Sequence, residues 1–159
     1  MADTTVYVNA AMADDTGNGL TAGTAKMYVR SGTAILRSTA VGTGHTLNIA
    51  DGTYTNALDY ILLDHANFAN LTINGGGRTT TLINPPTYGL TGPLTNLTVN
   101  VNNLSFKPST TQNAVSNNDA ANNVINVTKV DLISPVGYNA RLLYCKDGAI
   151  NPKNVRLFF

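Results

Sequence analysis

The chain has 159 residues, which is enough for one domain with a continuous core. Charged residues make up 12%, about half the usual share of a soluble domain, and 22 Thr and 21 Asn residues fill the gap. A formal charge of +1 supplies no cationic field for phosphate backbones or anionic lipids, so we expect neither nucleic acid nor a membrane as a partner.

The only cysteine, Cys145, excludes a disulfide within the chain. The first residues are polar and then strand-like, and no apolar run approaches the length of a membrane span. We therefore expect a chain without a signal peptide that is made in the cytoplasm. Its Thr/Asn-rich composition is nevertheless typical of an exposed protein. A virion component satisfies both expectations, because it assembles inside a host cell and is released by lysis.

The first elements are a strand, a turn and a weak helix. The β-branched run at 5–9 predicts the strand, and the Asp, Asn and Gly residues of 14–19 predict the turn. A calcium site with ligands from Asp14, Asp15 and Asn18 is the less favoured interpretation, because the chain has no Glu to bind the ion with two oxygens. Good helix formers over 24–38 predict the helix, although Gly32 and Thr33 interrupt it.

From residue 42 onward the apolar period becomes two, which indicates strands. We predict them at 46–49, 53–55, 60–63, 71–73, 80–83, 97–101, 104–106, 124–127, 130–133, 142–145 and 155–159. Such short strands suit a parallel coil, where each interior strand is paired on both sides. The prolines fall between the predicted strands, and the polar stretch 109–123 is predicted to be a solvated or contact loop.

An apolar spacing of two, three and two residues recurs along the chain. The three sets are Val99, Val101, Leu104 and Phe106; Ile125, Val127, Val130 and Leu132; and Leu143, Cys145, Gly148 and Ile150. Their first positions lie 26 and 18 residues apart, a period typical of stacked rungs. We therefore predict an all-β fold, a short parallel β-helix, with residues 1–43 as N-terminal strand and cap and residues 44–159 as rungs.

Three motifs resemble right-handed parallel β-helix proteins of the pectin-lyase-like superfamily. The strand at Tyr7 is followed at 14–21 by a turn of the form D-x-x-x-x-G-L-T. Residues 44–54 are similar to the stretch G-D-T-V-x-V-x-x-G-T-Y, and residues 71–77 to the corner L-T-I-x-G-x-G. The resemblance implies a right-handed coil whose open N-terminal end is capped, in the family by a helix. It also implies kinship with the β-helical tailspikes and decoration proteins of phages.

The sequence shows no catalytic or metal-binding constellation. Enzymes of this superfamily use clustered acidic residues, whereas the acidic residues here are scattered singly: Asp51, Asp59, Asp64, Asp119, Asp131 and Asp147. Asp131 and Asp147 are the one pair that could stack, because adjacent rungs lie about 4.8 Å apart. His45 and His65 have no partners at a ligand spacing and are predicted in turns or at the surface. We expect no enzyme activity, no cofactor and no metal.

The residues Leu157, Phe158 and Phe159 carry the clearest hint of a partner. A bare coil end exposes unpaired backbone groups, so this apolar tail is predicted either to close its own coil or to dock on a neighbour. Four N-x-S/T triplets, at Asn70, Asn96, Asn103 and Asn126, are interpreted as rung-corner residues whose amides stack and bond one another.

Taken together, these features lead us to expect a non-enzymatic structural protein of a bacteriophage virion, a capsid decoration or cement protein. We expect it to form a homotrimer and to bind the capsid lattice or the tail. One alternative is a receptor- or glycan-binding tail fibre or tailspike component, with tyrosines exposed along one face: Tyr54, Tyr60, Tyr88, Tyr138 and Tyr144. The other is the N-terminal fragment of a polysaccharide lyase or hydrolase.

Overall fold

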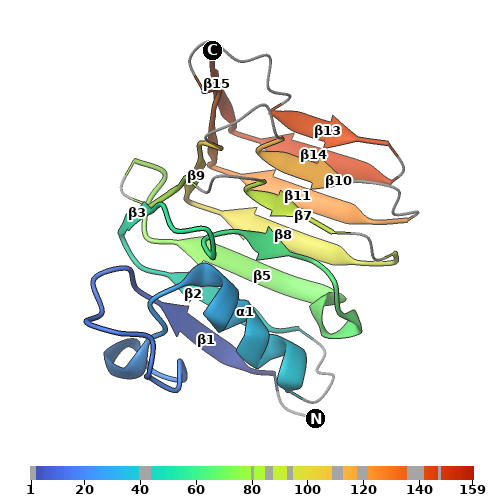
Figure 1. Cartoon of the computed structure of the whole chain (residues 1–159). Helices are drawn as coiled ribbons and strands as arrows, with labels where there is room; N and C mark the ends of the chain where they lie inside the picture. Colours follow the sequence, from blue (N-terminus) through green and yellow to red (C-terminus); the bar gives the residue numbers. More distant parts are fainter. Residues whose placement is uncertain are drawn as a thin grey trace.

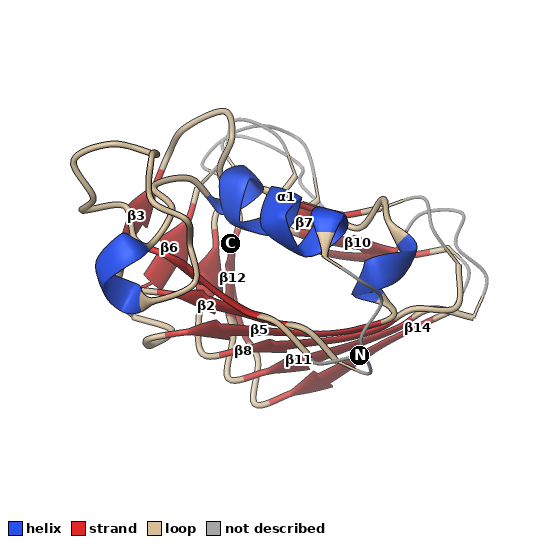
Figure 2. Ribbon diagram, turned by 90° about the horizontal axis from the view of Figure 1, so that it is seen from below, coloured by secondary structure: helices blue, strands red, loops and turns tan. Residues whose placement is uncertain are grey.

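A computed structural model shows the chain as a parallel β-solenoid with an N-terminal cap (Figure 1). The residues that it describes are 3–39, 44–79, 81–84, 88–92, 95–108, 113–117, 122–135, 142–146 and 148–159. Within these residues every strand pairing is parallel, and the strands stack as successive rungs in three sheets. Seen along the coil in Figure 2, the first and third sheets face each other and the second lies at one side.

The first sheet is the longest, and its strands follow one another along the coil. They are β1 (Thr5–Val8), β2 (Thr46–Ile49), β5 (Asn70–Gly75), β8 (Thr98–Asn102), β11 (Val124–Thr128) and β14 (Ala149–Lys153). The second sheet contains β3 (Gly52–Tyr54), β6 (Thr81–Ile83), β9 (Ser105–Phe106), β12 (Asp131–Ile133) and β15 (Arg156–Phe158). The third contains β4 (Ile61–Leu62), β7 (Leu90–Thr91), β10 (Val115–Asn117) and β13 (Leu143–Cys145).

The core consists of apolar columns that run along the coil axis. Leu71, Val99, Ile125 and Ile150 occupy matching positions on successive strands of the first sheet. The first three are at most 1% exposed, because alternate side chains of each strand point into the coil. Each rung buries its apolar side chains against the rungs on either side, so short strands are enough to build the core.

At the corners between the first and second sheets, one residue adopts the left-handed backbone conformation. Asn103, Lys129 and Asn154 have φ angles of 55°, 53° and 54° at the same place in three successive rungs. A single residue in this conformation turns the chain sharply, and Asn tolerates it better than other side chains do. At an earlier corner Gly75 is required for space, since a Cβ there would lie 2.3 Å from the carbonyl oxygen of Asn103.

The N-terminal end of the coil is covered by α1 (Val29–Ser38), which follows a short 3-10 turn, η1 (Ala22–Thr24). The predicted helix is therefore correct in kind but begins at Val29. Gly32 does not interrupt it. This glycine lets the helix approach β1, because a Cβ would lie 2.5 Å from Cγ2 of Val8. A second short 3-10 turn, η2 (Ala66–Phe68), packs against α1 and β5.

Asp59 holds the start of α1 from a distant part of the chain. Its carboxylate accepts hydrogen bonds from the backbone N–H of Val29 at 3.1 Å and of Asn56 at 2.8 Å. Burial raises the pKa of Asp59, although these backbone donors oppose the shift. The helix is thus capped by a neighbouring loop, and Tyr28, at the local cap position, makes no side-chain cap hydrogen bond.

The apolar repeat is confirmed for its first two sets and wrong for its third. The set that matches Val99 and Ile125 begins at Ile150, on β14, and continues through Pro152, Val155 and Leu157. The interval is therefore 25 residues rather than 18. Leu143 and Cys145 belong to β13 in the third sheet. The prediction was wrong because Gly148 and Ile150 follow Leu143 and Cys145 at the expected spacing, although Leu143 and Cys145 lie on the third sheet and Ile150 on the first.

Two predictions also need correction, and one strand was missed. The stretch 109–123 was predicted to be a polar loop, yet it contributes β10, whose residues Val115, Ser116 and Asn117 are at most 1% exposed. Pro152 does not lie between strands but within β14, where an edge position tolerates its missing N–H. The strand β7 was not predicted at all, because two residues carry too little pattern.

Candidate functional site

The predicted interaction residues lie on the last rung of the solenoid. Leu157 and Phe158 belong to β15, which pairs with β12, so the backbone of this segment completes the coil. Their side chains nevertheless stay 49% and 44% exposed, and Phe159 is 95% exposed. The backbone therefore closes the rung, as the first of the two sequence alternatives expected, and the side chains remain exposed; docking on a neighbour stays a prediction.

Three sheet edges lie at this end of the solenoid, two on the last rung and one, that of β13, on the rung before it. β13, β14 and β15 each stand last in their sheet, so within the described residues their outer backbone edges have no strand partner. The opposite end differs, because β1 is flanked by the segment that contains Lys26 and its inner side is covered by α1. Among the described residues the N-terminal end of the solenoid is thus covered, whereas at the other end, called the open end below, β13, β14 and β15 are paired on one side only (Figure 1).

An acidic residue ties this rung to the coil. The carboxylate of Asp131, which is 4% exposed, accepts hydrogen bonds from two nitrogens of Arg156, one of them at 2.7 Å. Arg78 approaches it at 3.8 Å and also donates to the backbone oxygen of Asn154 at 3.2 Å. The carboxylate beside Arg156 raises the pKa of that guanidinium. Asp131 therefore serves here as an ion-pair partner, and the Asp147 with which it was predicted to stack lies outside the described residues.

The other candidate ligands are engaged in backbone contacts. Asp14 Oδ1 and Asn18 Oδ1 accept hydrogen bonds from backbone N–H groups two residues ahead, which confirms the predicted turn. Asp15 Oδ1 accepts from the N–H of Met27 and of Tyr28. Among the described residues no three His, Cys, Asp or Glu side chains come together as metal ligands.

The two histidines have structural contacts, and one of them was placed wrongly. His65 Nδ1 accepts from the N–H of Asn67 at the start of η2. His45, expected in a turn or at the surface, is 1% exposed, and its Nδ1 accepts from the N–H of Thr4 at 3.1 Å.

The tyrosines do not form one exposed face. Tyr54 is fully buried, and its hydroxyl donates to the backbone oxygen of Ala50 at 2.9 Å, so its expected exposure is wrong. Tyr60, Tyr88 and Tyr144 are partly exposed, and Tyr138 lies outside the described residues. An aromatic residue that the prediction did not include, Tyr7, is half-buried on the outer face of β1.

Hydrogen-bonded asparagines line the outer face of the first sheet. Two ladders run across the strands, one through Asn48, Asn74 and Asn102 and one through Asn100, Asn126 and Asn151. Of the four asparagines predicted to stack at corners, Asn126 is in a ladder but lies within a strand, and Asn96 Oδ1 accepts from Asn122 Nδ2 at 3.2 Å. No amide–amide hydrogen bond joins Asn70 or Asn103 to another described residue, and Asn70 begins β5. Among the outward-facing residues of these six strands only Lys153 is charged.

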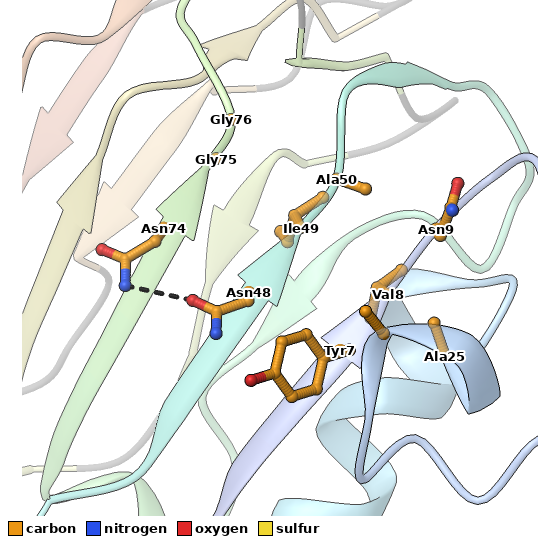
Figure 3. Close-up of a pocket in the computed structure, with 11 residues that line it drawn as sticks. Tyr7, Val8, Asn9, Ala25, Asn48, Ile49, Ala50, Asn74, Gly75 and Gly76 are labelled. Atoms are coloured by element: carbon orange, nitrogen blue, oxygen red, sulfur yellow. Dashed lines mark hydrogen bonds between the residues drawn. The ribbon is translucent and has the colours of Figure 1, made fainter.

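One pocket opens where this face meets the N-terminal segment, and Figure 3 shows it in close-up. It has a volume of about 240 Å³. Its eleven lining residues are Tyr7, Val8, Asn9, Ala22, Ala25, Asn48, Ile49, Ala50, Asn74, Gly75 and Gly76. Sequence reasoning missed this site, because its residues come from four separate segments and carry no motif.

Comparisons with protein-family models, with curated proteins and with solved structures gave no match. Within the described residues, no helix has the length and apolar character needed to cross a bilayer.

Proposed function

We propose that this chain is a non-enzymatic structural protein of a bacteriophage virion, a decoration protein that attaches to the capsid through the open end of its solenoid. The pectin-lyase-like resemblance of the sequence supports this kinship by analogy alone. The observation that carries the proposal is the open end, where β13, β14 and β15 have no outer strand partner among the described residues and Leu157, Phe158 and Phe159 on the last rung are exposed.

The physical argument is that such an end can bind another protein in two ways at once. Unpaired strand edges accept a further strand through backbone hydrogen bonds, and the apolar side chains beside them lose water when covered. Covering one large apolar side chain contributes about 1.5 to 3 kcal/mol. A repeated capsid lattice would present the same partner to each copy of the rod. We further propose that three copies assemble as a homotrimer.

Two measurements test the role and the assembly. Mass spectrometry of phage particles from the host that carries the gene should find the chain on purified heads in a fixed ratio to the capsid protein. Absence from the particles would refute the role. Light scattering of the isolated protein, whose chain mass is 16.7 kDa, should give three times that mass. A monomer in solution and on the head would refute the trimer.

A matched pair of variants tests the attachment surface. Leu157→Asp should reduce co-sedimentation with heads at least tenfold, because a charge enters the surface that must be covered. Leu20→Asp is the control, since Leu20 is 51% exposed, as Leu157 is 49%, but lies near the N-terminal cap. Equal binding by the two variants, both shown to be folded, would place the contact elsewhere.

A further inference from the structure

Charge is distributed unevenly along the chain, although the formal total is only +1. Residues 1–64 contain three Lys or Arg and six Asp, whereas residues 65–159 contain seven Lys or Arg and three Asp. Among the described residues, the part of the coil that follows β5 contains six cationic side chains and a single carboxylate side chain, that of Asp131. The half of the solenoid toward the open end is therefore cationic.

Four of these cations gather at one corner of the coil, beside the open end. The Asp131 carboxylate accepts hydrogen bonds from Arg156 and lies 3.8 Å from Nε of Arg78. Lys129 precedes Asp131 by two residues, and its backbone N–H donates to the backbone oxygen of Lys153 at 3.0 Å. Arg78, Lys129, Lys153 and Arg156 are named the cationic corner below.

The cationic corner keeps an excess of positive charge. Its carboxylate, Asp131, is 4% exposed and already contacts two guanidinium groups. Lys129 and Lys153 are exposed, and neither forms an ion pair with a described residue. Like charges held this close repel one another, so the corner favours a partner that brings further carboxylates.

The adjoining edge of β15 favours a polypeptide as that partner. The N–H of Arg156 donates to the oxygen of Val130 at 3.1 Å, and the oxygen of Phe158 accepts from the N–H of Ser134 at 2.8 Å. These two residues therefore bond toward β12, and the N–H and C=O of Leu157 between them point to the outer edge. No described strand pairs with that edge. A strand of another protein can bond to it, whereas a nucleic acid lacks the backbone groups of a β-ladder.

The side chains of β15 indicate the pattern that such a strand needs. Leu157 continues the buried column of Leu132 and is 49% exposed because no described rung follows it. Arg156 is aligned with Asp131, and Cζ of Arg156 lies 5.5 Å from the centre of the Phe158 ring. Since successive residues of a strand point to opposite faces, an apolar residue over Leu157 has as its neighbour a residue over Arg156. An acidic residue there would repeat the position of Asp131 on the other side of the guanidinium.

We propose that the open end binds an acidic strand of its partner protein. In this strand, apolar residues that cover Leu157 alternate with Asp or Glu residues that contact the cationic corner. The inference rests on the proposed function, because it uses the same end of the solenoid for attachment, and it adds the chemistry of the partner. Edge pairing, apolar contact and charge then act together on one segment.

Binding of synthetic peptides to the isolated protein tests the proposal without phage heads. Three labelled peptides are compared by fluorescence anisotropy: one in which Val and Asp alternate, and two in which Asn or Lys replaces each Asp. The acidic peptide should bind, the Asn peptide at least tenfold more weakly, and the Lys peptide not at all. Added salt should weaken the binding of the acidic peptide. Equal binding by the three peptides, or none by the acidic one, overturns the proposal.

A matched pair of charge reversals locates the binding. Lys153→Glu should weaken the affinity for the acidic peptide at least tenfold. Lys107→Glu is the control, because Lys107 is partly exposed, forms no ion pair with a described residue and follows β9, two strands away from β15 in the second sheet. The control should bind as the unmodified chain does. Equal losses in the two variants, both shown to be folded, overturn the site.

A second variant removes a charge without disturbing the corner. Lys129→Asn places at this position the residue that occupies the same place in the neighbouring rungs, Asn103 and Asn154, so the left-handed conformation is kept. It should weaken binding of the acidic peptide at least threefold and leave the unfolding temperature unchanged. Unchanged affinity would show that the cationic corner does not contact the peptide and would overturn the proposal.

Further probes separate an acidic strand from other occupants. The acidic peptide with alternate backbone nitrogens methylated cannot pair fully with β15 and should bind at least tenfold more weakly; equal binding overturns the strand. Tighter binding of a single-stranded oligonucleotide, lost in Lys153→Glu, would show that the corner recognises phosphate and would overturn the proposal. If no acidic peptide binds but assemblies larger than a trimer form in low salt and Lys153→Glu separates them, the occupant is a second copy and the proposal is wrong.

The result is separable from that for the decoration role. Binding of the acidic peptide without attachment to phage heads refutes the role and supports the acidic strand. Attachment to heads that Lys153→Glu leaves unchanged, together with no peptide binding, refutes the acidic strand and leaves the role standing.

Discussion

Tyr54 combines a polar group with complete burial. Its ring fills the coil between the first and second sheets, and its hydroxyl reaches the backbone oxygen of Ala50 and accepts from the N–H of Ala10 at 3.3 Å. Burial raises the pKa of Tyr54 to about 12, because the phenolate would lose its hydration. The protonation state of this buried side chain therefore makes the stability of the fold depend on pH.

The tyrosine predicts a dependence of stability on alkaline pH. Since the folded pKa is raised above the unfolded value of about 10, the contribution of the neutral phenol is complete below pH 10 and is lost as the pH rises toward 12. The free energy of unfolding should fall by about 1.4 kcal/mol per pH unit in this window. Urea titrations of the unmodified chain and of Tyr54→Phe at several pH values test this. If the free energy of unfolding depends on pH equally in both, the prediction is wrong.

A second residue-scale prediction concerns Arg156. Removing its guanidinium leaves the buried Asp131 carboxylate with the more distant Arg78, so Arg156→Gln should lower the free energy of unfolding. Arg37→Gln is the comparison, because Arg37 pairs with Asp64 at the surface, where ion pairs contribute about 0 to 1 kcal/mol. Thermal denaturation of both variants decides, and a larger loss for Arg37→Gln would refute the role of Asp131.

At the scale of elements, the cap shows how tertiary contacts override local preference. Gly32 and Thr33 weaken the helix by propensity, yet both are buried against the coil. Val29 and Leu36 complete the apolar side that covers β1 and β2. The helix therefore depends on its fit to the first rungs more than on its own sequence.

Gly32→Ala tests that fit. In an exposed helix the change would add about 1 kcal/mol of stability. Here the new Cβ would lie 2.5 Å from Cγ2 of Val8, so we expect a loss of about 1 to 3 kcal/mol from overpacking. Gly23→Ala is the control, because nothing lies within 4 Å of a Cβ there. Chemical denaturation of the two variants is the measurement, and stabilisation by Gly32→Ala would show that the cap packs loosely.

At the scale of the molecule, the solenoid is a one-dimensional stack in which each rung contacts only its neighbours. In the part of the chain that the structure describes, β5 and β8 are paired on both sides, whereas β14 and β15 are paired on one side only. The open end should therefore unfold locally more often than the covered end.

Hydrogen exchange tests this gradient. Amides of β5 and β8 should exchange most slowly and those of β14 and β15 fastest, because opening the last rung breaks pairings on one side alone. Mass spectrometry of peptic fragments in the isolated protein is the readout. If β14 is as well protected as β8, the open end is covered in solution, which would favour self-association at that end.

The sequence by itself determined the fold class, because alternating apolar residues, Asn and Gly corners and a spacing near 26 residues each agree with stacked rungs. It also indicated the N-terminal cap and the hydrogen bonding of asparagine amides between rungs, though for two of its four residues only. Only the tertiary structure decided which segments share a sheet, since β7 is too short and β10 too polar to give a strand pattern. In addition, Leu143 and Cys145 of β13 have the apolar spacing of a different sheet. The pocket was beyond sequence reasoning for the same reason: its lining is assembled from segments far apart in the chain, and burial and proximity arise only when the rungs stack.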